Sequence, residues 1–247
     1  MSAFPELAAV AGPGRIEPFL QPVARLSDGA LVGFEALARW RRDDGGVEGA
    51  ASFFPNGPWT DENAEIGRAV GAAAIEAFAA WRRPRAAHLS VNIIGRDLYD
   101  GAARRLADLA QARGIAPGEL VLELTEHHAL PDMPAAAAEL AALRDRGVRI
   151  ALDDFGTGHS SLAWLARLPV DALKIDRSFV SRITEPGVES LVIAAVLSLA
   201  RALGLDVIAE GLETEAQRAE LLARGCTLGQ GGLFAMPLPA AEAFALF

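Results

Sequence analysis

The chain alternates short apolar β segments with stretches of helical composition, and this alternation is what most restricts its fold. The segments predicted as strands after the first part of the chain are His88–Asn92, Leu120–Glu123, Val148–Asp153, Ala172–Asp176, Asp206–Glu210 and Cys226–Phe234. Helices are predicted over Asp61–Trp81, 97–113, 134–146, 160–167, 188–203, 214–224 and Ala240–Phe247. Strands that alternate with helices in this way predict a mainly parallel sheet.

The first part of the chain follows a different pattern. Ile16–Arg25 and Leu31–Arg39 are predicted strands, and the Asp28-Gly29 pair between them is typical of a hairpin turn. So short a connection requires the two strands to be antiparallel. Together with the six later strands, they predict an α/β fold, a modified TIM-type (β/α)₈ barrel with an antiparallel first strand. We expect residues 1–247 to form a single barrel domain with its core at about residues 16–240.

Charge and composition exclude several classes of protein. The 23 basic and 32 acidic residues give a net charge of −9, and no basic stretch is interleaved with aromatic residues, which argues against a nucleic-acid polymer as partner. The longest uncharged apolar run, Ser190–Ala200, is too short to span a membrane, and the sequence predicts a cytoplasmic protein. A single cysteine, Cys226, cannot form a thiolate metal cage, so oxygen atoms would hold any metal.

Polar side chains follow or end most of the predicted strands, and they are the candidate functional residues. They are Glu35, Asn92, Glu123, Asp153 with Asp154, Lys174, Glu210 and Gln230. In a barrel of this type the carboxyl ends of the strands converge on one mouth, where the chemistry is placed. Five carboxylates there would raise one another's pKa unless cations neutralise them, and hard oxygen ligands favour Mg²⁺ or Mn²⁺. The adjacent Asp153 and Asp154 suggest two metals about 3.5–4 Å apart, an arrangement that acts on phosphoesters.

Each of these patterns also has a purely structural interpretation. A single acid after a strand, such as Glu123 or Glu210, is more often the N-cap of the next helix than a metal ligand. The Asp153–Gly156 segment is equally typical of a turn, and Arg39 is either a solvated charge at a strand end or a phosphate contact. The agreement of six strand ends favours a common site over separate caps.

The same residues, in this order, resemble the EAL-domain family, bacterial phosphodiesterases that open cyclic di-GMP to linear 5′-pGpG. The resemblance runs from Phe19–Val23 to Phe234–Pro239 and includes Glu35-Ala36-Leu37 itself. The other matching motifs are Glu123–Glu126, Asp153–Gly158, Lys174–Asp176, Glu210–Thr214 and Gln230-Gly231. The combination is highly specific, whereas no single motif is.

The resemblance implies a role for each matching residue. One metal would be held by Glu35, Asn92, Glu123 and Asp153, and a second by Asp153, Asp154 and Glu210. Lys174 would lie beside the attacking water and the scissile phosphate, and Gln230 would support the water and the metal shell. Gln21, Leu37 and Arg39 match positions that contact substrate. Glu126 and Glu213 match acids that anchor the loop after Asp154 and brace the lysine region.

The resemblance also implies a homodimer, formed through the region that follows Asp153–Gly158. Three positions depart from the family pattern: Ile94 stands where serine is usual, Gly232 where tyrosine is usual, and Phe54–Gly57 lacks acidic residues. We expect these departures to affect substrate affinity and rate rather than the type of reaction.

The leading hypothesis is therefore a metal-dependent cyclic di-GMP phosphodiesterase, in which a water activated by two metals attacks phosphorus. The alternative is a receptor that binds cyclic di-GMP without hydrolysing it and signals through a protein partner. A third class, an interaction module that binds no nucleotide, would leave the acidic residues unexplained. The chain contains no recognisable sensor or cyclase segment, so it is either an excised domain or a stand-alone enzyme, and any regulatory domain or partner would lie outside it.

Overall fold

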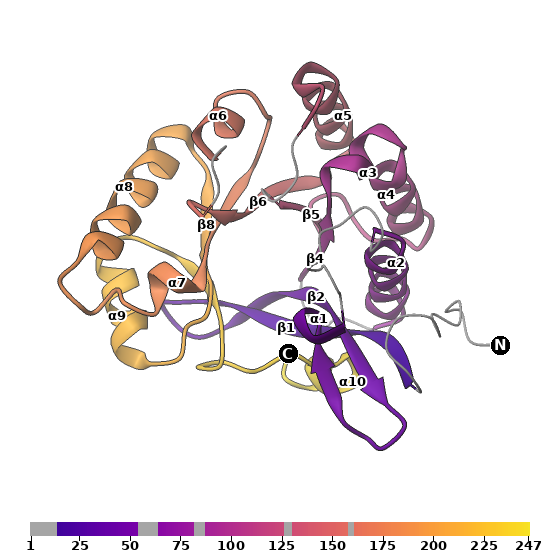
Figure 1. Cartoon of the computed structure of the whole chain (residues 1–247), viewed down its shortest axis with the longest axis horizontal. Helices are drawn as coiled ribbons and strands as arrows, with labels where there is room; N and C mark the ends of the chain where they lie inside the picture. The colour runs from indigo at the N-terminus through magenta and orange to yellow at the C-terminus, as the bar shows by residue number, and fades with distance from the viewer. Residues whose placement is uncertain (1–13, 54–63, 82–86, 126–129, 158–160) are drawn as a thin grey trace.

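The strands form a closed barrel (Figure 1). A computed structural model of the chain describes residues 14–53, 64–81, 87–125, 130–157 and 161–247. The barrel strands are β1 (Gly14–Arg25), β2 (Leu31–Arg42), β4 (His88–Ile93), β5 (Leu120–Thr125), β6 (Arg149–Phe155), β7 (Ala172–Ile175), β8 (Asp206–Ala209) and β9 (Leu228–Gln230). They are arranged in that order, and β1 pairs with both β2 and β9 to close the ring.

The direction of β1 confirms the predicted modified TIM-type barrel. β1 is antiparallel to both of its barrel neighbours, whereas every other neighbouring pair in the ring is parallel. The predicted hairpin is correct, but β2 runs three residues past Arg39 and pairs with the short β3 (Val47–Gly49). The predicted strand Cys226–Phe234 is shorter than expected, because Gly231 has a φ of 153° and the chain turns away after Gln230. β10 (Leu238–Pro239) then pairs with β1.

Helices lie outside the ring of strands (Figure 1). They are α1 (Ala50–Phe53), α2 (Ala64–Ala80), α3 (Gly95–Tyr99), α4 (Ala102–Ala112), α5 (Met133–Asp145), α6 (Ser161–Leu165), α7 (Arg177–Val180), α8 (Val188–Leu203), α9 (Glu215–Ala223) and α10 (Ala240–Ala245). The helices predicted over 134–146, 188–203 and 214–224 are confirmed. The single helix predicted over 97–113 is wrong in one respect, because it is divided into α3 and α4 at Gly101, which has a φ of 77°. The short α1 and α7 were not predicted. No helix in the described ranges is both long and apolar enough to cross a membrane.

Side chains alternate along each strand between the barrel interior and the helices. On β5 and β6, Leu122 and Leu152 belong to the large apolar core. Val121, Ala151 and Ala172 form a separate small buried cluster, since they face the interior. Glu123, Asp153 and Lys174 each come two residues after one of these three and therefore share the interior face. Because side chains on one face of a strand recur every two residues, apolar side chains fill the middle of the barrel interior and charged side chains lie at its mouth.

An aromatic cluster joins the last helix of the chain to the second strand. Phe34 is fully buried next to Glu35 in sequence, and its ring makes edge contacts with Trp81 at 5.7 Å and with Phe244 at 5.5 Å between centroids. Trp81 and Phe244 stack at 4.6 Å. The cluster fixes α10 and the end of α2 against the strand that carries Glu35.

Removing the Phe34 ring tests the importance of this cluster. We expect Phe34→Ala to lower the free energy of unfolding by about 3–5 kcal/mol, because it leaves a cavity between β2, Trp81 and α10. Phe34→Leu, which keeps most of the volume, is the control and should cost much less. Urea denaturation followed by circular dichroism measures both, and a loss below about 1 kcal/mol for Phe34→Ala would show that the cluster is dispensable.

Candidate active site

The carboxyl ends of the barrel strands bring the predicted site residues together. Glu35, Asn92, Glu123, Asp153 and Lys174 lie on β2, β4, β5, β6 and β7 in turn. Glu210 directly follows β8, and Gln230 ends β9. Most of these side chains are buried, although the cluster is strongly charged. The mouth of the barrel therefore holds the acidic cluster that the strand ends predict.

Lys174 lies at the centre of this cluster. Its ammonium group is 2.6 Å from Glu210, 2.7 Å from Glu123, 3.1 Å from Asp153 and 3.2 Å from Glu35, and the side chain is 1% exposed. One ammonium group cannot balance the charge of four ionised carboxylates. The cluster carries an excess of buried negative charge, and that charge calls for further cations or for bound protons.

The pKa shifts of these groups follow from burial and from Lys174. Burial raises the pKa of Glu123 to about 8 and raises those of Asp153 and Glu210, and the attraction of Lys174 does not fully offset it. Burial acts in the same way on Glu35, but Lys174 and two amide donors outweigh it and hold the pKa of Glu35 below its usual value. The four carboxylates hold the pKa of Lys174 well above its usual value despite burial, so the lysine is protonated.

Two amide side chains complete the cluster. Asn92 donates from Nδ2 to Glu35 Oε1 at 3.0 Å, and Gln230 donates from Nε2 to Glu35 Oε2 at 2.5 Å and to Glu210 at 3.2 Å. These bonds use the amide nitrogens and leave Asn92 Oδ1 and Gln230 Oε1 buried without a hydrogen-bond donor. Buried oxygen atoms without a donor beside a carboxylate cluster are suited to a hard cation.

Asp153 and Asp154 both join the cluster although neighbouring residues of a strand normally point to opposite faces. The pairing of β6 with β7 is interrupted between Leu152 and Phe155, and Asp154 adopts a φ of 54°. It is the only residue other than glycine with a positive φ in the described ranges, a conformation that costs about 1–3 kcal/mol. Thr157 supports the turn by donating its backbone N–H and its hydroxyl to the Asp154 carbonyl.

The oxygen ligands form two groups that share one residue. Glu35, Glu123 and Asp153 can each offer a carboxylate oxygen within 4.8 Å of the others, and so can Asp153, Asp154 and Glu210. With Asn92 Oδ1 beside the first group, the ligand set contains only oxygen atoms, which suits Mg²⁺ or Mn²⁺ better than a softer metal. The residues present therefore fit two divalent cations.

Residues that the sequence did not reveal brace the end of β4 behind Asn92. Asp97 is buried and accepts a 2.9 Å hydrogen bond from the backbone N–H of Ile94, two residues after Asn92. Arg68 of α2 donates to the other oxygen of Asp97 at 2.7 Å and also pairs with Asp100. The chain at Ile94 is therefore held by a backbone hydrogen bond, and not by the side-chain hydroxyl of the serine that is usual at this position.

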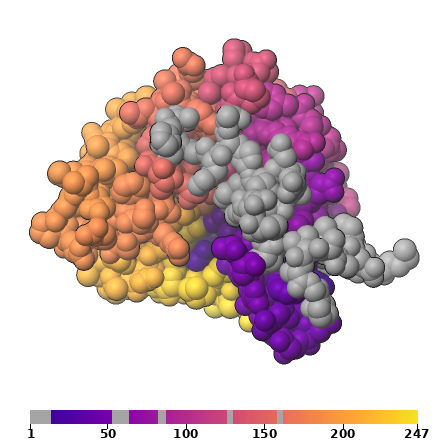
Figure 2. All heavy atoms as spheres, in the orientation of Figure 1, coloured from indigo at the N-terminus to yellow at the C-terminus, as the bar shows by residue number. Residues whose placement is uncertain are grey.

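An open pocket of about 800 Å³ lies over the cluster, within the usual size range of small-molecule sites. Gln21 and Arg39 line it from β1 and β2, Glu210 and Gln230 from the cluster, and Glu213 from the exposed segment beyond β8. The other lining residues are Arg177, Ser178, Ser181, Gly211, Gly231, Gly232, Met236 and Pro237. In Figure 2 the hollow near the centre of this face lies between indigo, orange and yellow segments, the colours of these residues.

Two of the three predicted substrate contacts, Gln21 and Arg39, line this pocket. The third, Leu37, does not, and instead lines with Arg39 a smaller, mainly apolar pocket of about 80 Å³ that reaches Asn92. Burial lowers the pKa of Arg39, while Glu35 opposes that shift. Glu213 is exposed and is not among the carboxylates that contact Lys174 in the described residues. Glu126 and the Phe54–Gly57 segment lie outside the described residues.

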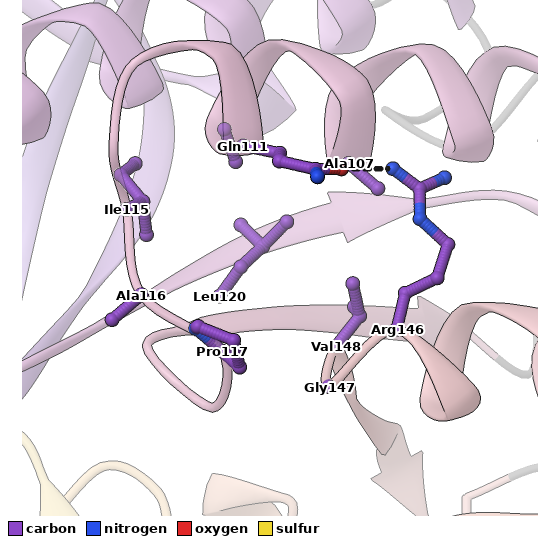
Figure 3. A pocket seen from close by; sticks show the side chains of 10 residues that line it. Ala107, Gln111, Ile115, Ala116, Pro117, Leu120, Arg146, Gly147 and Val148 are labelled. Atoms are coloured by element: carbon purple, nitrogen blue, oxygen red, sulfur yellow. Dashed lines mark hydrogen bonds between the residues drawn. The ribbon is translucent and has the colours of Figure 1, made fainter.

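A different pocket, of about 190 Å³, lies at the opposite end of β5 (Figure 3). It is lined mostly by apolar side chains, among them Ile115, Leu120 and Val148, and Arg146 donates a 3.0 Å hydrogen bond to Gln111 beside it. Among the residues that the structure describes, no carboxylate lines it, and it is formed by α4 together with the segments that lead into β5 and β6. The open pocket of about 800 Å³ over the acidic cluster, called the mouth pocket below, is therefore the candidate active site.

Addition of Mn²⁺ to the metal-free protein tests the ligand groups. Cations that bind only the folded state raise the melting temperature, and we expect a clear rise here because the cluster carries excess negative charge. Asp153→Asn removes the residue shared by both groups and should abolish most of that rise. Asp206→Asn, at the opposite end of β8, is the matched control and should behave as wild type. Equal shifts for Asp153→Asn and wild type would contradict the assignment.

Comparisons with known proteins agree with this geometry. The family model described as EAL domain matches residues 9–237. The cyclic di-GMP phosphodiesterase NbdA of Pseudomonas aeruginosa is 36% identical over 244 residues, 92% of this chain and 29% of that protein. The probable cyclic di-GMP phosphodiesterase PdeB of Escherichia coli K12 is 35% identical over 221 residues, 89% of this chain and 42% of that protein.

A solved structure shows the same architecture. The PaMucR phosphodiesterase in complex with c-di-GMP has a TM-score of 0.83 to this chain at 33% identity, with 92% of this chain and 94% of that one covered. The chain spans only 27% to 42% of the length of the curated relatives reported for it. The family match, the barrel with its reversed first strand and the acidic mouth lead to one conclusion: the chain belongs to the EAL domain family.

Proposed function

We propose that this chain hydrolyses cyclic di-GMP to linear 5′-pGpG with the help of two divalent cations, Mg²⁺ or Mn²⁺. The observation that carries the proposal is the pair of oxygen ligand groups that share Asp153 next to Lys174, beneath an open pocket. The names of the relatives NbdA and PdeB as cyclic di-GMP phosphodiesterases support the choice of substrate.

The two cations would be held by the carboxylate groups of the cluster and by Asn92. Glu35, Asn92, Glu123 and Asp153 would bind one, and Asp153, Asp154 and Glu210 the other. Bound there, the cations would neutralise the carboxylates, bind the phosphate oxygens and lower the pKa of a coordinated water. Hydrolysis then joins the water oxygen to phosphorus, while the 3′-oxygen leaves and takes up a proton.

The side chains of the protein would supply orientation and charge. Lys174 has three N–H donors and four carboxylate neighbours, so its ammonium can exchange a carboxylate for a phosphate oxygen or a water. Gln230, held by Glu35 and Glu210, would keep the water in place. Arg39 forms no ion pair within the described residues and donates one hydrogen bond, to the Ala38 carbonyl at 2.8 Å, so its remaining N–H groups can bind the substrate.

A second copy of the chain is the proposed protein partner. The resemblance to the family suggests contact through the region after Asp153–Gly158, and α6 begins at Ser161 in that region. Leu162 of α6 is 67% exposed, which supports an apolar contact there. Burial of such a side chain would favour association.

Incubation of the purified protein with cyclic di-GMP and Mg²⁺ or Mn²⁺, followed by chromatography, tests the activity directly. We expect pGpG to form, and we expect Lys174→Arg to lower the rate by about 10²-fold or more, because a bulky guanidinium does not fit the buried position of the ammonium. Glu35→Gln should also abolish turnover, since it replaces a carboxylate ligand of the cluster with a neutral amide.

The folded state of both variants is checked by circular dichroism, and Asp206→Asn serves as the active control. If the wild-type protein binds cyclic di-GMP saturably in Ca²⁺ but shows no turnover in Mg²⁺ or Mn²⁺, the result would show that the chain is a receptor and not an enzyme. Full activity of Lys174→Arg would instead contradict the role given to the lysine.

A further inference from the structure

Nearly every arginine in the described residues pairs with a carboxylate. Four have no such partner: Arg39, Arg167, Arg177 and Arg201. Two of these four, Arg39 and Arg177, line the mouth pocket. Arg39 donates to the backbone carbonyl of Ala38 at 2.8 Å, whereas the Arg177 guanidinium has no acceptor among the described residues. Its place in the pocket leaves its N–H donors available to a ligand that supplies acceptors.

Arg177 is held in place by the backbone that follows Glu210. It begins α7 directly after Asp176, whose side chain caps that helix by accepting from the Ser178 N–H. Gly211 has a φ of 68°, and a Cβ placed on it would lie 2.4 Å from the Cβ of Arg177. The Gly211 backbone thus packs against the base of the Arg177 side chain, while the residue as a whole is exposed. The Cβ end of the Arg177 side chain is therefore held beside the acidic cluster, while its guanidinium group is accessible to a ligand.

The wall of the pocket beyond Gln230 is apolar. Gly232 has no side chain, and Met236 fills the space, since its sulfur lies 3.5 Å from where a Cβ on Gly232 would be. Met236 is 65% exposed and lines the pocket with Pro237. An apolar face of this kind suits the π-face of a nucleobase, whereas a phosphate gains nothing from it.

We propose that Arg177 recognises a guanine of the substrate by donating two hydrogen bonds to O6 and N7, with Met236 against the face of the base. The inference rests on the proposed function and identifies the residue that distinguishes guanine from the other bases in the mouth pocket. O6 and N7 of guanine are the acceptor pair that the planar guanidinium fork matches best among base edges. The contact forms when the substrate binds and does not change as the phosphodiester opens, so it acts on affinity rather than on the chemical step.

Kinetics of Arg177→Ala with two substrates test the proposal. With cyclic di-GMP, we expect KM to rise about tenfold or more while kcat stays within about twofold of wild type. With the analogue that carries 7-deazaguanine in place of both guanines, wild type should show a raised KM, because N7 is missing. Arg177→Ala should not distinguish the two substrates. Arg201→Ala, which changes an exposed arginine of α8 outside the pocket that has no carboxylate partner in the described residues, is the matched control and should keep wild-type values.

The outcomes separate this inference from the proposed function. No turnover of cyclic di-GMP by wild type contradicts the function itself. If wild type is active, an unchanged KM for Arg177→Ala overturns the role of Arg177. A KM that rises while Arg177→Ala still discriminates between the two substrates as wild type does assigns Arg177 to the phosphate and overturns the guanine contact. A fall in kcat with KM unchanged also overturns it.

Discussion

The excess of buried carboxylate around one ammonium group is the constraint on which the rest of the site depends. Lys174 contacts four acids within 3.2 Å and is almost completely buried, yet it can balance only part of their charge. Buried ionised groups without compensation are expensive, and the raised pKa values of Glu123, Asp153 and Glu210 reflect that cost. In the proposed function, the two divalent cations would supply the missing positive charge, which connects the barrel mouth to metal binding.

The barrel supports this charge with rigid neighbours. Leucine and isoleucine side chains on the outward faces of β5, β6 and β7 belong to the main core, so the strands that carry Glu123, Asp153 and Lys174 are held by packing. The end of β4 is held differently, through Asp97 and Arg68. The strained backbone at Asp154 is tolerated because Thr157 and the surrounding strands fix it. Stability elsewhere in the molecule thus maintains a site that would be unfavourable alone.

Much of the fold and the cluster could be predicted from the sequence, because both follow from simple periodicities. The alternation of strands and helices predicts the barrel, and the polar residue at each strand end predicts the acidic mouth. The inward position of the Asp154 side chain could not be predicted from the strand pattern. In a regular strand, Asp153 and Asp154 would point to opposite faces, and only the irregularity in β6 brings both into the cluster. Arg177 and Asp97 were also missed. Their significance lies in contacts across the fold, with Gly211 and with Arg68, for which a single sequence holds no local pattern.

In the proposed function, two cations share Asp153 in the mouth of the barrel. Anomalous scattering from crystals grown with Mn²⁺ measures this directly, because it locates the metal without reference to activity. We expect two peaks, one among Glu35, Asn92, Glu123 and Asp153 and one among Asp153, Asp154 and Glu210. Crystals with saturating Mn²⁺ that show no peak at Asp153, or show metal only elsewhere on the chain, would contradict it.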